Sequence, residues 1–230
     1  MKNIAIIPAR GGSKRLPRKN IIDFKGKPII CWTIESAIKS GVFDEVVVST
    51  EDDEIASIAL ECGAKVEYRD KSLALDESTV NEVLLSILNK RTAEGNLPDI
   101  FCCLYATSPL RNAEDIKNIV SLVTNGSCQQ ALAVTEFDLP AHQAMLFSNS
   151  KELTPLFPNW INKRQAEVAN IVVDNGSTYV ATVQSFLRTK SLLPEGVFGY
   201  FMPKIRSIDI DEIHDLNVAL MNADLLGVGE

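Results

Sequence analysis

The chain has 230 residues, of which 46% are hydrophobic and 23% are charged; this composition excludes a disordered protein and allows one buried core with a small appendage. Acidic residues outnumber basic ones by 30 to 23, and the net charge of −7 argues against a protein that coats the phosphate backbone of a nucleic acid. No apolar run approaches the roughly 20 residues of a membrane span, and the apolar stretch near the N-terminus is too short for a signal peptide, so we expect neither membrane insertion nor export.

The five cysteines are odd in number and show no C-x-x-C spacing; they are Cys31, Cys62, Cys102, Cys103 and Cys128. In places they fall within apolar runs, where free thiols pack as small hydrophobic side chains. We therefore expect free thiols in a reducing cytoplasm. Only His142 and His214 are available to complete a zinc site, so structural zinc is not expected.

The first part of the chain alternates between strand and helix patterns. Residues 4–7 form a continuous apolar run, which is typical of a strand buried on both faces of a parallel sheet. Helical spacing predicts helices at 29–40, 51–62, 78–93 and 113–123, the first of which should end at Gly41. Further strands are expected at 46–48, 65–68, 100–105 and 131–135. This order predicts an α/β fold, a Rossmann-like and mostly parallel sheet with helices on both faces.

The rhythm changes after residue 135. Residues 138–163 hold three prolines and no clear helical period, so we expect an arm inserted at about 138–170 into a single domain that spans 1–230. Its aromatic residues Phe147, Phe157 and Trp160 would pack either against another subunit or as a small cluster on their own domain. Strands at 171–173, 177–181 and 197–202 and a helix from 211 to about 225 complete the expected fold.

Positive charge concentrates at residues 10–27, where seven basic residues face one acid, Asp23. This stretch follows the first strand, at the edge of the sheet where open α/β folds bind ligands, and Gly11-Gly12-Ser13 lets backbone N–H groups approach an anion. We interpret it as a polyphosphate-binding loop; the alternative is a solvated basic turn. It matches neither the P-loop nor the G-x-G-x-x-G dinucleotide motif, which argues against P-loop NTPases and dehydrogenases.

Two carboxylates alternate near the C-terminus, at Asp209 and Asp211. Alternate residues of an extended segment point the same way, so the pair could bind one Mg²⁺, which prefers hard oxygen ligands. The alternative is that Asp211 caps the last helix and Asp209 lies on the surface.

Together these motifs resemble the acylneuraminate, or nonulosonic acid, cytidylyltransferases over nearly the whole chain. The residues that carry the resemblance are Ile7-Pro8-Ala9-Arg10, Gly11-Gly12-Ser13-Lys14, Pro17-Arg18-Lys19-Asn20, Gly26-Lys27-Pro28-Ile29-Ile30, Val48-Ser49-Thr50-Glu51-Asp52, Thr107-Ser108-Pro109-Leu110-Arg111 and Ser207-Ile208-Asp209-Ile210-Asp211. The resemblance implies a fold of the nucleotide-diphospho-sugar transferase type and a homodimer formed through the arm. It also implies the reaction: the anomeric hydroxyl of a nine-carbon 2-keto sugar acid attacks the α-phosphorus of CTP, giving a CMP-sugar and pyrophosphate.

Site residues follow from the same resemblance. Those implied for the nucleotide are Ala9, Arg10, Gly11, Ser13, Asn20, Arg69, Thr107 and Ser108, although Arg69 could equally be an exposed surface arginine. Those implied for catalysis are Arg10, Lys14 and Lys19 at the triphosphate, with Lys19 nearest the leaving pyrophosphate, and Asp209 and Asp211 as Mg²⁺ ligands. Those implied for the sugar are Tyr105, Arg164, Gln165, Asp174 and Asn175.

The sugar-side residues distinguish branches of the family. Tyr105-Ala106-Thr107, residues 134–137 and Asp174 look more like the pseudaminic acid branch, so we expect pseudaminic acid or a related 5,7-diamino sugar acid first and sialic or legionaminic acid second. More distant alternatives are a transferase for the eight-carbon Kdo or for a hexose 1-phosphate. A non-catalytic nucleotide-binding regulator is the alternative from another class, and the retained aspartate pair argues against it.

Overall fold

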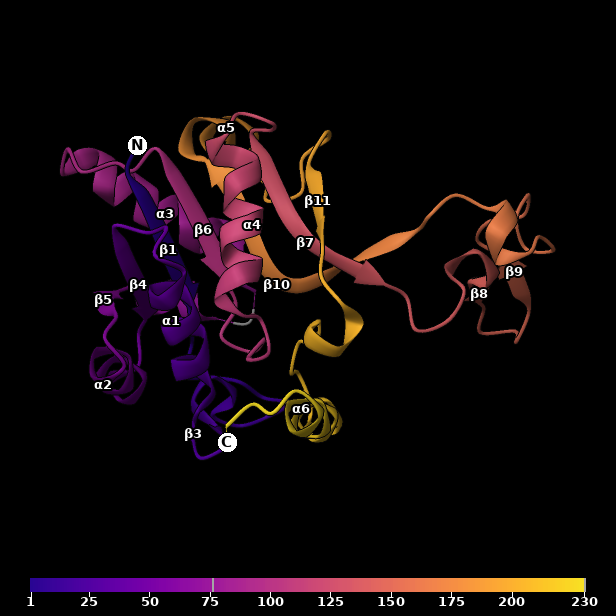
Figure 1. Cartoon of the computed structure of the whole chain (residues 1–230), viewed down its shortest axis with the longest axis horizontal. Helices are drawn as coiled ribbons and strands as arrows, with labels where there is room; N and C mark the ends of the chain where they lie inside the picture. The colour runs from indigo at the N-terminus through magenta and orange to yellow at the C-terminus, as the bar shows by residue number, and fades with distance from the viewer. Residues whose placement is uncertain (76, 230) are drawn as a thin grey trace.

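A seven-stranded sheet forms the body of the protein, in the order β11-β7-β10-β6-β1-β4-β5 (Figure 1). This computed structural model describes residues 1–75 and 77–229. The strands are β1 (Asn3–Pro8), β4 (Glu45–Thr50), β5 (Lys65–Tyr68), β6 (Ile100–Leu104), β7 (Gln130–Glu136), β10 (Val172–Thr182) and β11 (Phe198–Phe201). Strand β10 is antiparallel to both β6 and β7, and the remaining pairs are parallel, which confirms the predicted mostly parallel sheet.

Helices cover both faces of the sheet, as predicted. Helices α1 (Ile29–Ser40), α2 (Asp53–Glu61) and α4 (Ala113–Thr124) pack on one face, and α3 (Val80–Ala93) and α5 (Val183–Thr189) pack on the other. Along β1, Ile4 and Ile6 face the α3 side while Ala5 and Ile7 face the α1 side, so the continuous apolar run is buried on both faces. Helix α1 ends at Gly41, whose positive φ of 66° suits glycine at this position.

A third apolar cluster brings the two ends of the chain together. Helix α6 (Ile213–Leu225) packs its Leu216 and Ala219 against Leu16 and Phe24 of the basic loop, with Ile210 between them. The loop contains two short strands, β2 (Asp23–Phe24) and β3 (Lys27–Pro28). This packing places the segment just before α6 against the N-terminal loop, although about 190 residues separate them in sequence, as the Lys19–Asp211 contact shows.

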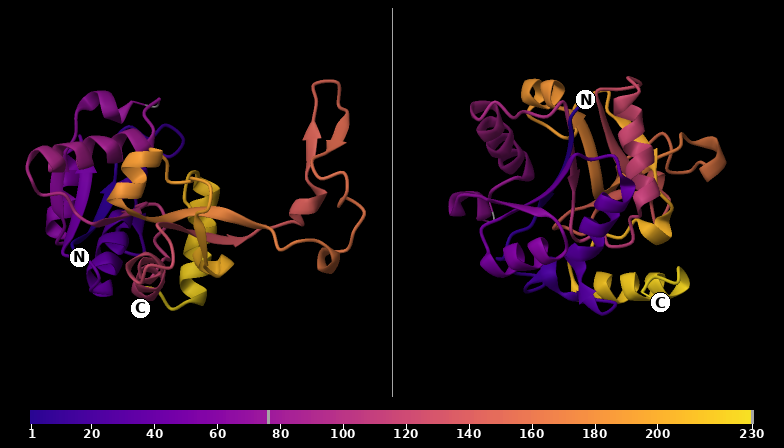
Figure 2. Two further views of the ribbon diagram at one scale, coloured as in Figure 1. Left: turned by 90° about the horizontal axis from the view of Figure 1, so that it is seen from above. Right: turned by 60° about the vertical axis from the view of Figure 1, so that its left-hand side comes forward.

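Between β7 and β10 the chain leaves the sheet and forms an arm that projects from the body (Figures 1 and 2). Its outer part carries a hairpin of β8 (Met145–Phe147) and β9 (Leu153–Pro155). The hairpin exposes apolar side chains, including Phe147 at 72%, whereas Phe157 and Trp160 are half-buried and stack on each other at 5.7 Å between ring centroids. The hairpin and α5 were not predicted, and the two strands expected at 171–173 and 177–181 are one bent strand, β10.

The expectation of five free thiols is wrong for two of them. Cys31 in α1 and Cys62 after α2 form a disulfide, because the packing of these helices on one face brings the two side chains together. Cys102, Cys103 and Cys128 are free and buried, as expected, and burial raises the pKa of Cys102 to about 12. No helix in the described part of the chain is long and apolar enough to cross a membrane.

Candidate functional site

A cavity of about 330 Å³ opens where β1 and β6 end. Pro8 ends β1, Tyr105 follows β6, and the basic loop forms the opposite wall. The predicted nucleotide residues that line this cavity are Arg10, Ser13, Asn20, Arg69 and Thr107, and Lys14 and Lys19 of the predicted catalytic set line it as well. Such a position, at the carboxyl edge of parallel strands, is where open α/β sheets bind ligands.

Three other predicted nucleotide residues, Ala9, Gly11 and Ser108, do not line this cavity. Ala9 is fully buried in the core, and its N–H donates to the Ser49 carbonyl at 2.9 Å. Ser108 is also buried, directly after Thr107. Asn20 contributes to the loop itself as well, because its amide donates to the Arg10 carbonyl at 2.9 Å and so ties the two ends of the loop together.

Carboxylates at the end of β4 hold the glycine turn. The Gly11 N–H donates to Glu51 Oε1 at 2.8 Å, and Arg69 Nε and Nη2 both donate to Glu51 Oε2 at 3.0 Å. The Arg69 side chain is only 6% exposed, so the reading of Arg69 as a surface arginine is wrong. Glu51 was predicted to lie in the first turn of a helix, but α2 begins at Asp53 and leaves Glu51 free to turn toward the loop.

The neighbouring Asp52 binds the second half of the same loop. Arg18 donates to its two carboxylate oxygens at 2.5 and 3.0 Å, and the hydrogen bond from Arg18 lowers the pKa of Asp52 below its usual value. Gly11 lies so close that a Cβ there would stand 2.3 Å from Asp52 Oδ2. Only glycine fits this contact, which explains one of the two glycines in the turn.

The aspartate pair comes from the other end of the chain, and Asp211 contacts two basic residues, Arg15 and Lys19, that line this cavity. Asp211 Oδ1 accepts from Lys19 Nζ at 2.5 Å, and Asp211 Oδ2 accepts from Arg15 Nη2 at 2.5 Å. Burial opposes the charged form, but the two cations hold the pKa of Asp211 below its usual value. The residue that caps α6 is Glu212, so the reading of Asp211 as a helix cap is wrong.

Asp209 is half-buried beside Thr107, so the surface reading is wrong for it too. The Thr107 hydroxyl donates to Asp209 Oδ1 at 2.5 Å, and burial raises the pKa of Asp209. On its other side lies Gly176, where a Cβ would stand 2.8 Å from Asp209 Oδ2. Gly176 also has a positive φ of 66°, and it was not singled out from the sequence.

Asp209 lines a second cavity of about 650 Å³, whereas its partner Thr107 lines the first, so the two cavities adjoin at this hydrogen bond. Asp174, Asn175 and Asp209 line this second cavity together with Glu136, Asp138 and Lys204. The Tyr179 hydroxyl donates to Asp174 at 2.9 Å, and the Tyr179 ring lies 5.5 Å from that of Tyr105. Asn175 is largely used within the fold, since its amide donates to Ser207 and its carbonyl accepts from Ser177.

The remaining predicted sugar residues lie elsewhere. Arg164 and Gln165 lie between β9 and β10, in the projecting arm, and neither lines the first or the second cavity. Within one chain, the structure therefore brings Tyr105, Asp174 and Asn175 to the cavities but not this pair.

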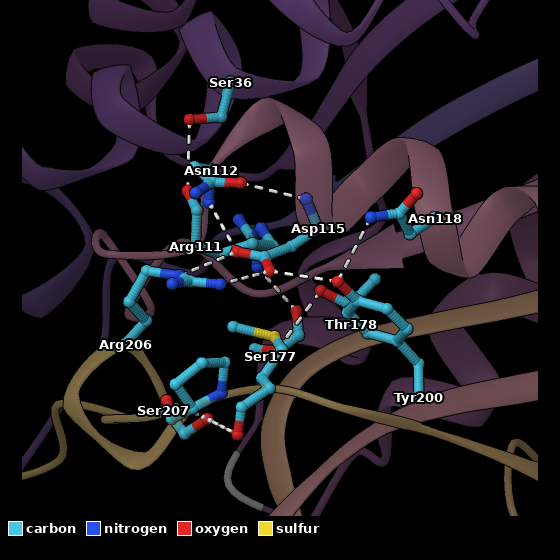
Figure 3. A network of polar contacts seen from close by, with 12 residues as sticks. Ser36, Arg111, Asn112, Asp115, Asn118, Ser177, Thr178, Tyr200, Arg206 and Ser207 are labelled. Carbon is cyan, nitrogen blue, oxygen red and sulfur yellow. Dashed lines mark hydrogen bonds and ion pairs between the residues drawn. The ribbon is translucent and has the colours of Figure 1, made fainter.

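Beneath the site lies a buried arginine that the sequence analysis did not name as a site residue. Arg111 donates to the Ser177 carbonyl at 2.7 Å and to the Thr33 hydroxyl at 2.8 Å, and burial lowers its pKa to about 10. It also contacts the Tyr105 carbonyl at 3.3 Å, so one guanidinium links the end of β6 to β10 beneath the cavities (Figure 3).

The donor set fits Mg²⁺. Within residues 1–75 and 77–229 no group of three or more His, Cys, Asp or Glu side chains is arranged to hold a metal ion. Mg²⁺ commonly takes one or two protein carboxylates and completes its shell with water and substrate phosphate oxygens, so the pair Asp209 and Asp211 beside a phosphate-sized cavity suffices. Because residue 176 is a glycine, no side chain occupies the space beside Asp209 Oδ2, where a Cβ would stand 2.8 Å from this oxygen.

Comparisons with known proteins agree with this arrangement. A family model described as "Cytidylyltransferase" matches residues 4–154. The chain is 37% identical to a pseudaminic acid cytidylyltransferase of Campylobacter jejuni, over 95% of both chains. It is 35% identical to a CMP-N,N'-diacetyllegionaminic acid synthase of Legionella pneumophila, over 92% of this chain and 91% of that protein. It is 32% identical to an N-acylneuraminate cytidylyltransferase of Streptococcus agalactiae, where 94% of this chain matches 52% of the relative.

Solved structures show the same fold. A CMP:2-keto-3-deoxy-manno-octonic acid synthetase complexed with CTP superposes with a TM-score of 0.73 at 20% identity, over 97% of this chain and 100% of that one. A cytidylyltransferase from Leptospira borgpetersenii superposes with a TM-score of 0.61 at 20% identity, over 99% of this chain and 93% of that one. At these identities the likeness concerns the fold alone.

Proposed function

Because this chain belongs to the cytidylyltransferase family, we propose that it joins CTP to a nine-carbon 2-keto sugar acid and releases pyrophosphate. The chain is thus a nucleotidyltransferase. Pseudaminic acid or a related 5,7-diamino sugar acid is the first candidate substrate, and legionaminic or N-acetylneuraminic acid is the second. The observation that carries the proposal is the contact of Asp211 with Lys19, which joins the aspartate pair to the basic wall of the first cavity.

The first cavity would receive CTP. Arg10, Lys14 and Lys19 line it from one loop, so the triphosphate would lie along that wall, where its charge can be neutralised. Asp211 now binds Lys19 and Arg15, and a triphosphate would compete with this carboxylate for both cations. Lys19 would then stabilise the charge that develops on the leaving pyrophosphate.

Asp209 and Asp211 would hold Mg²⁺ together with oxygens of the nucleotide. When bound, the ion would shield the α-phosphate and lower the pKa of the attacking hydroxyl. Transfer of Lys19 and Arg15 to the triphosphate would free both oxygens of Asp211 for this role. Thr107 would keep Asp209 in place through its hydrogen bond, so that the two carboxylates face the same space.

The second cavity would receive the sugar acid. It adjoins the first at Asp209, so a sugar held there would present its anomeric hydroxyl toward the α-phosphate. Among the described residues that line it, Glu136, Asp138 and Asp174 are acceptors for N–H and O–H groups, and Lys204 is the single cation. A wall rich in acceptors suits a sugar with several acylamido and hydroxyl donors, and it disfavours a second phosphate, as in a hexose 1-phosphate.

A homodimer and a cytoplasmic location complete the proposal. The exposed apolar hairpin of β8 and β9 offers a surface for a second copy, and Arg164 and Gln165 could then reach the partner's cavity although they do not reach their own. We place the reaction in the cytoplasm because CTP is an intracellular metabolite. Light scattering of the purified protein tests the dimer.

Pyrophosphate release tests the reaction itself. CTP, UTP, GTP and ATP are each combined with pseudaminic, legionaminic and N-acetylneuraminic acids, with Kdo and with a hexose 1-phosphate. We expect turnover with CTP and a nine-carbon acid, fastest with pseudaminic acid. Turnover with UTP and a hexose phosphate would overturn the proposal, and CTP binding without any turnover would favour the non-catalytic regulator.

The Asp211→Asn variant tests the metal role. We expect turnover to fall by roughly 100-fold or more, because metal-held charge stabilisation contributes several kcal/mol. The matched control is Asp224→Asn, since Asp224 pairs with Lys25 and so links the same loop to α6 without lining the first cavity. Near-normal turnover of Asp211→Asn at saturating Mg²⁺ would contradict the role.

A further inference from the structure

An ion pair between a half-buried arginine, Arg206, and a buried carboxylate, Asp115, lies in the network drawn in Figure 3. Arg206 Nε donates to Asp115 Oδ2 at 3.1 Å, and Arg206 Nη2 donates to Asp115 Oδ1 at 2.7 Å. Asp115 is 2% exposed and also accepts from the Tyr200 hydroxyl at 3.2 Å. The geometry is the two-point arrangement that only a guanidinium can make with a carboxylate.

The pair joins two segments that both carry proposed site residues. Asp115 lies in the first turn of α4, and it exchanges two hydrogen bonds with the cap residue Asn112, at 2.9 and 3.1 Å. This turn directly follows residues 107–111, whose first member, Thr107, lines the first cavity. Arg206 directly precedes residues 207–211, which carry the aspartate pair.

The same two segments meet again at the site. The Thr107 hydroxyl donates to Asp209 at 2.5 Å, and the Ile210 N–H donates to the Thr107 carbonyl at 3.0 Å. The aspartate segment is therefore attached to the loop at two places, at Thr107 and at Asp115. Attachment at one place would let the segment pivot, whereas attachment at two places fixes its direction.

Stability alone does not explain this pair. Removing two charges from water costs free energy that their attraction often fails to offset, so a buried ion pair is weak evidence for stability. The two-point contact does, however, hold Arg206 and Asp115 in one relative position. Such precision matters near a reacting centre, where a shift of about 1 Å can cost about 100-fold in rate.

We propose that Asp115 and Arg206 are a positioning pair, which sets the place of Asp209 and Asp211 relative to Thr107. Neither residue lines either cavity, so they act through the segments they join. The inference rests on the proposed function, because it concerns the carboxylates to which that function assigns the metal.

The chain offers a matched control for this proposal. The Arg91 side chain is 6% exposed, against 24% for Arg206, and it pairs with Glu45 at 3.0 Å and with Glu67 at 3.2 Å. It lines neither of the two cavities. A substitution at Arg91 therefore disturbs a comparable ion pair without reaching the aspartate segment.

The experiment compares Arg206→Lys with Arg91→Lys, because lysine keeps the positive charge but cannot donate the two parallel hydrogen bonds of a guanidinium. For Arg206→Lys we expect kcat to fall about tenfold or more and the Mg²⁺ concentration for half-maximal rate to rise several-fold, with the KM for CTP within about twofold. For Arg91→Lys we expect a lower Tm with an unchanged kcat and an unchanged Mg²⁺ requirement. Electron paramagnetic resonance of Mn²⁺ in the presence of CTP supplies a readout apart from turnover, and binding should weaken only in Arg206→Lys.

Equal losses of activity in the two variants, in proportion to their losses of Tm, would show that the pair is merely structural. Normal kcat and normal Mn²⁺ binding in Arg206→Lys would also overturn the inference. An inactive wild-type protein would instead overturn the proposed function, and this outcome is distinct because it appears before any variant is made.

Discussion

Replacing Gly11 with alanine should disturb the basic loop through one identifiable contact. The new Cβ would stand 2.3 Å from Asp52 Oδ2 and 3.0 Å from Asp52 Cγ, which no side chain tolerates. Asp52 would have to move, and it would lose its ion pair with Arg18 and its hydrogen bond from the Ile55 N–H at 3.0 Å. The second of these caps the N-terminus of α2.

The size of the effect follows from these two losses. Loss of an N-cap hydrogen bond costs about 1 kcal/mol, and loss of a half-exposed ion pair costs about 0.2–1 kcal/mol. We therefore expect Gly11→Ala to lower the free energy of unfolding by about 1–2 kcal/mol, which corresponds to about 2–8 °C in Tm for a chain of this length. CTP affinity should fall as well, because Asp52 holds Arg18 of the same loop that lines the first cavity.

The adjacent glycine supplies the control. A Cβ at Gly12 would meet nothing within 4 Å, and this residue has no positive φ. Gly12→Ala should be neutral or stabilising by up to about 1 kcal/mol, since alanine restricts the unfolded chain. Urea denaturation and calorimetric titration with CTP measure both quantities. Equal stability and equal CTP affinity in the two variants would refute the argument from Asp52.

Two further predictions concern the aspartate segment and pH. Gly176→Ala and Gly126→Ala should each cost about 1–2 kcal/mol of unfolding free energy, because both glycines have positive φ. Only Gly176→Ala should also lower kcat, by about tenfold or more, since its Cβ alone would push Asp209; an equal kcat in both variants would contradict this. The hydrogen bond from Arg18 lowers the pKa of folded Asp52, so its stabilisation is present above the unfolded pKa and is lost as pH falls through the folded value. Denaturation from pH 6 to pH 2 should show this loss, and Asp52→Asn should flatten the profile; an unchanged slope would count against it.

Local patterns were sufficient for most of the body of the protein. The apolar run of β1 and the glycine after α1 are local signals that depend only on neighbouring residues, so the strand and the helix end were predicted correctly. The antiparallel direction of β10 depends on a chain reversal through the arm, which no local period encodes. The Cys31–Cys62 pairing likewise depends on how α1 and α2 pack.

The site divides in the same way. Its charged loop and alternating aspartates are local motifs, and the sequence predicted both. The partners that orient them are distant, since Arg206 and Asp115 lie 91 residues apart and Thr107 and Asp209 lie 102 apart. Glu51 gave a partial signal, because it follows a buried strand at the edge where ligands bind, but its role required knowing where α2 begins.

The base of the arm, which we call its stalk, consists of the paired ends of β7 and β10 at residues 134–136 and 172–174. It limits how the sequence of this protein can vary. Because β7 and β10 continue into it as a hydrogen-bonded ladder, with Val172 opposite Glu136 and Asp174 opposite Val134, the sheet itself sets the direction in which the arm points. Insertions at the tip of the hairpin would alter its length and leave the ladder intact. A single residue inserted in the ladder would exchange the faces of every side chain beyond it and turn Asp174 over. Relatives should therefore differ freely in the tip and keep the length of the stalk.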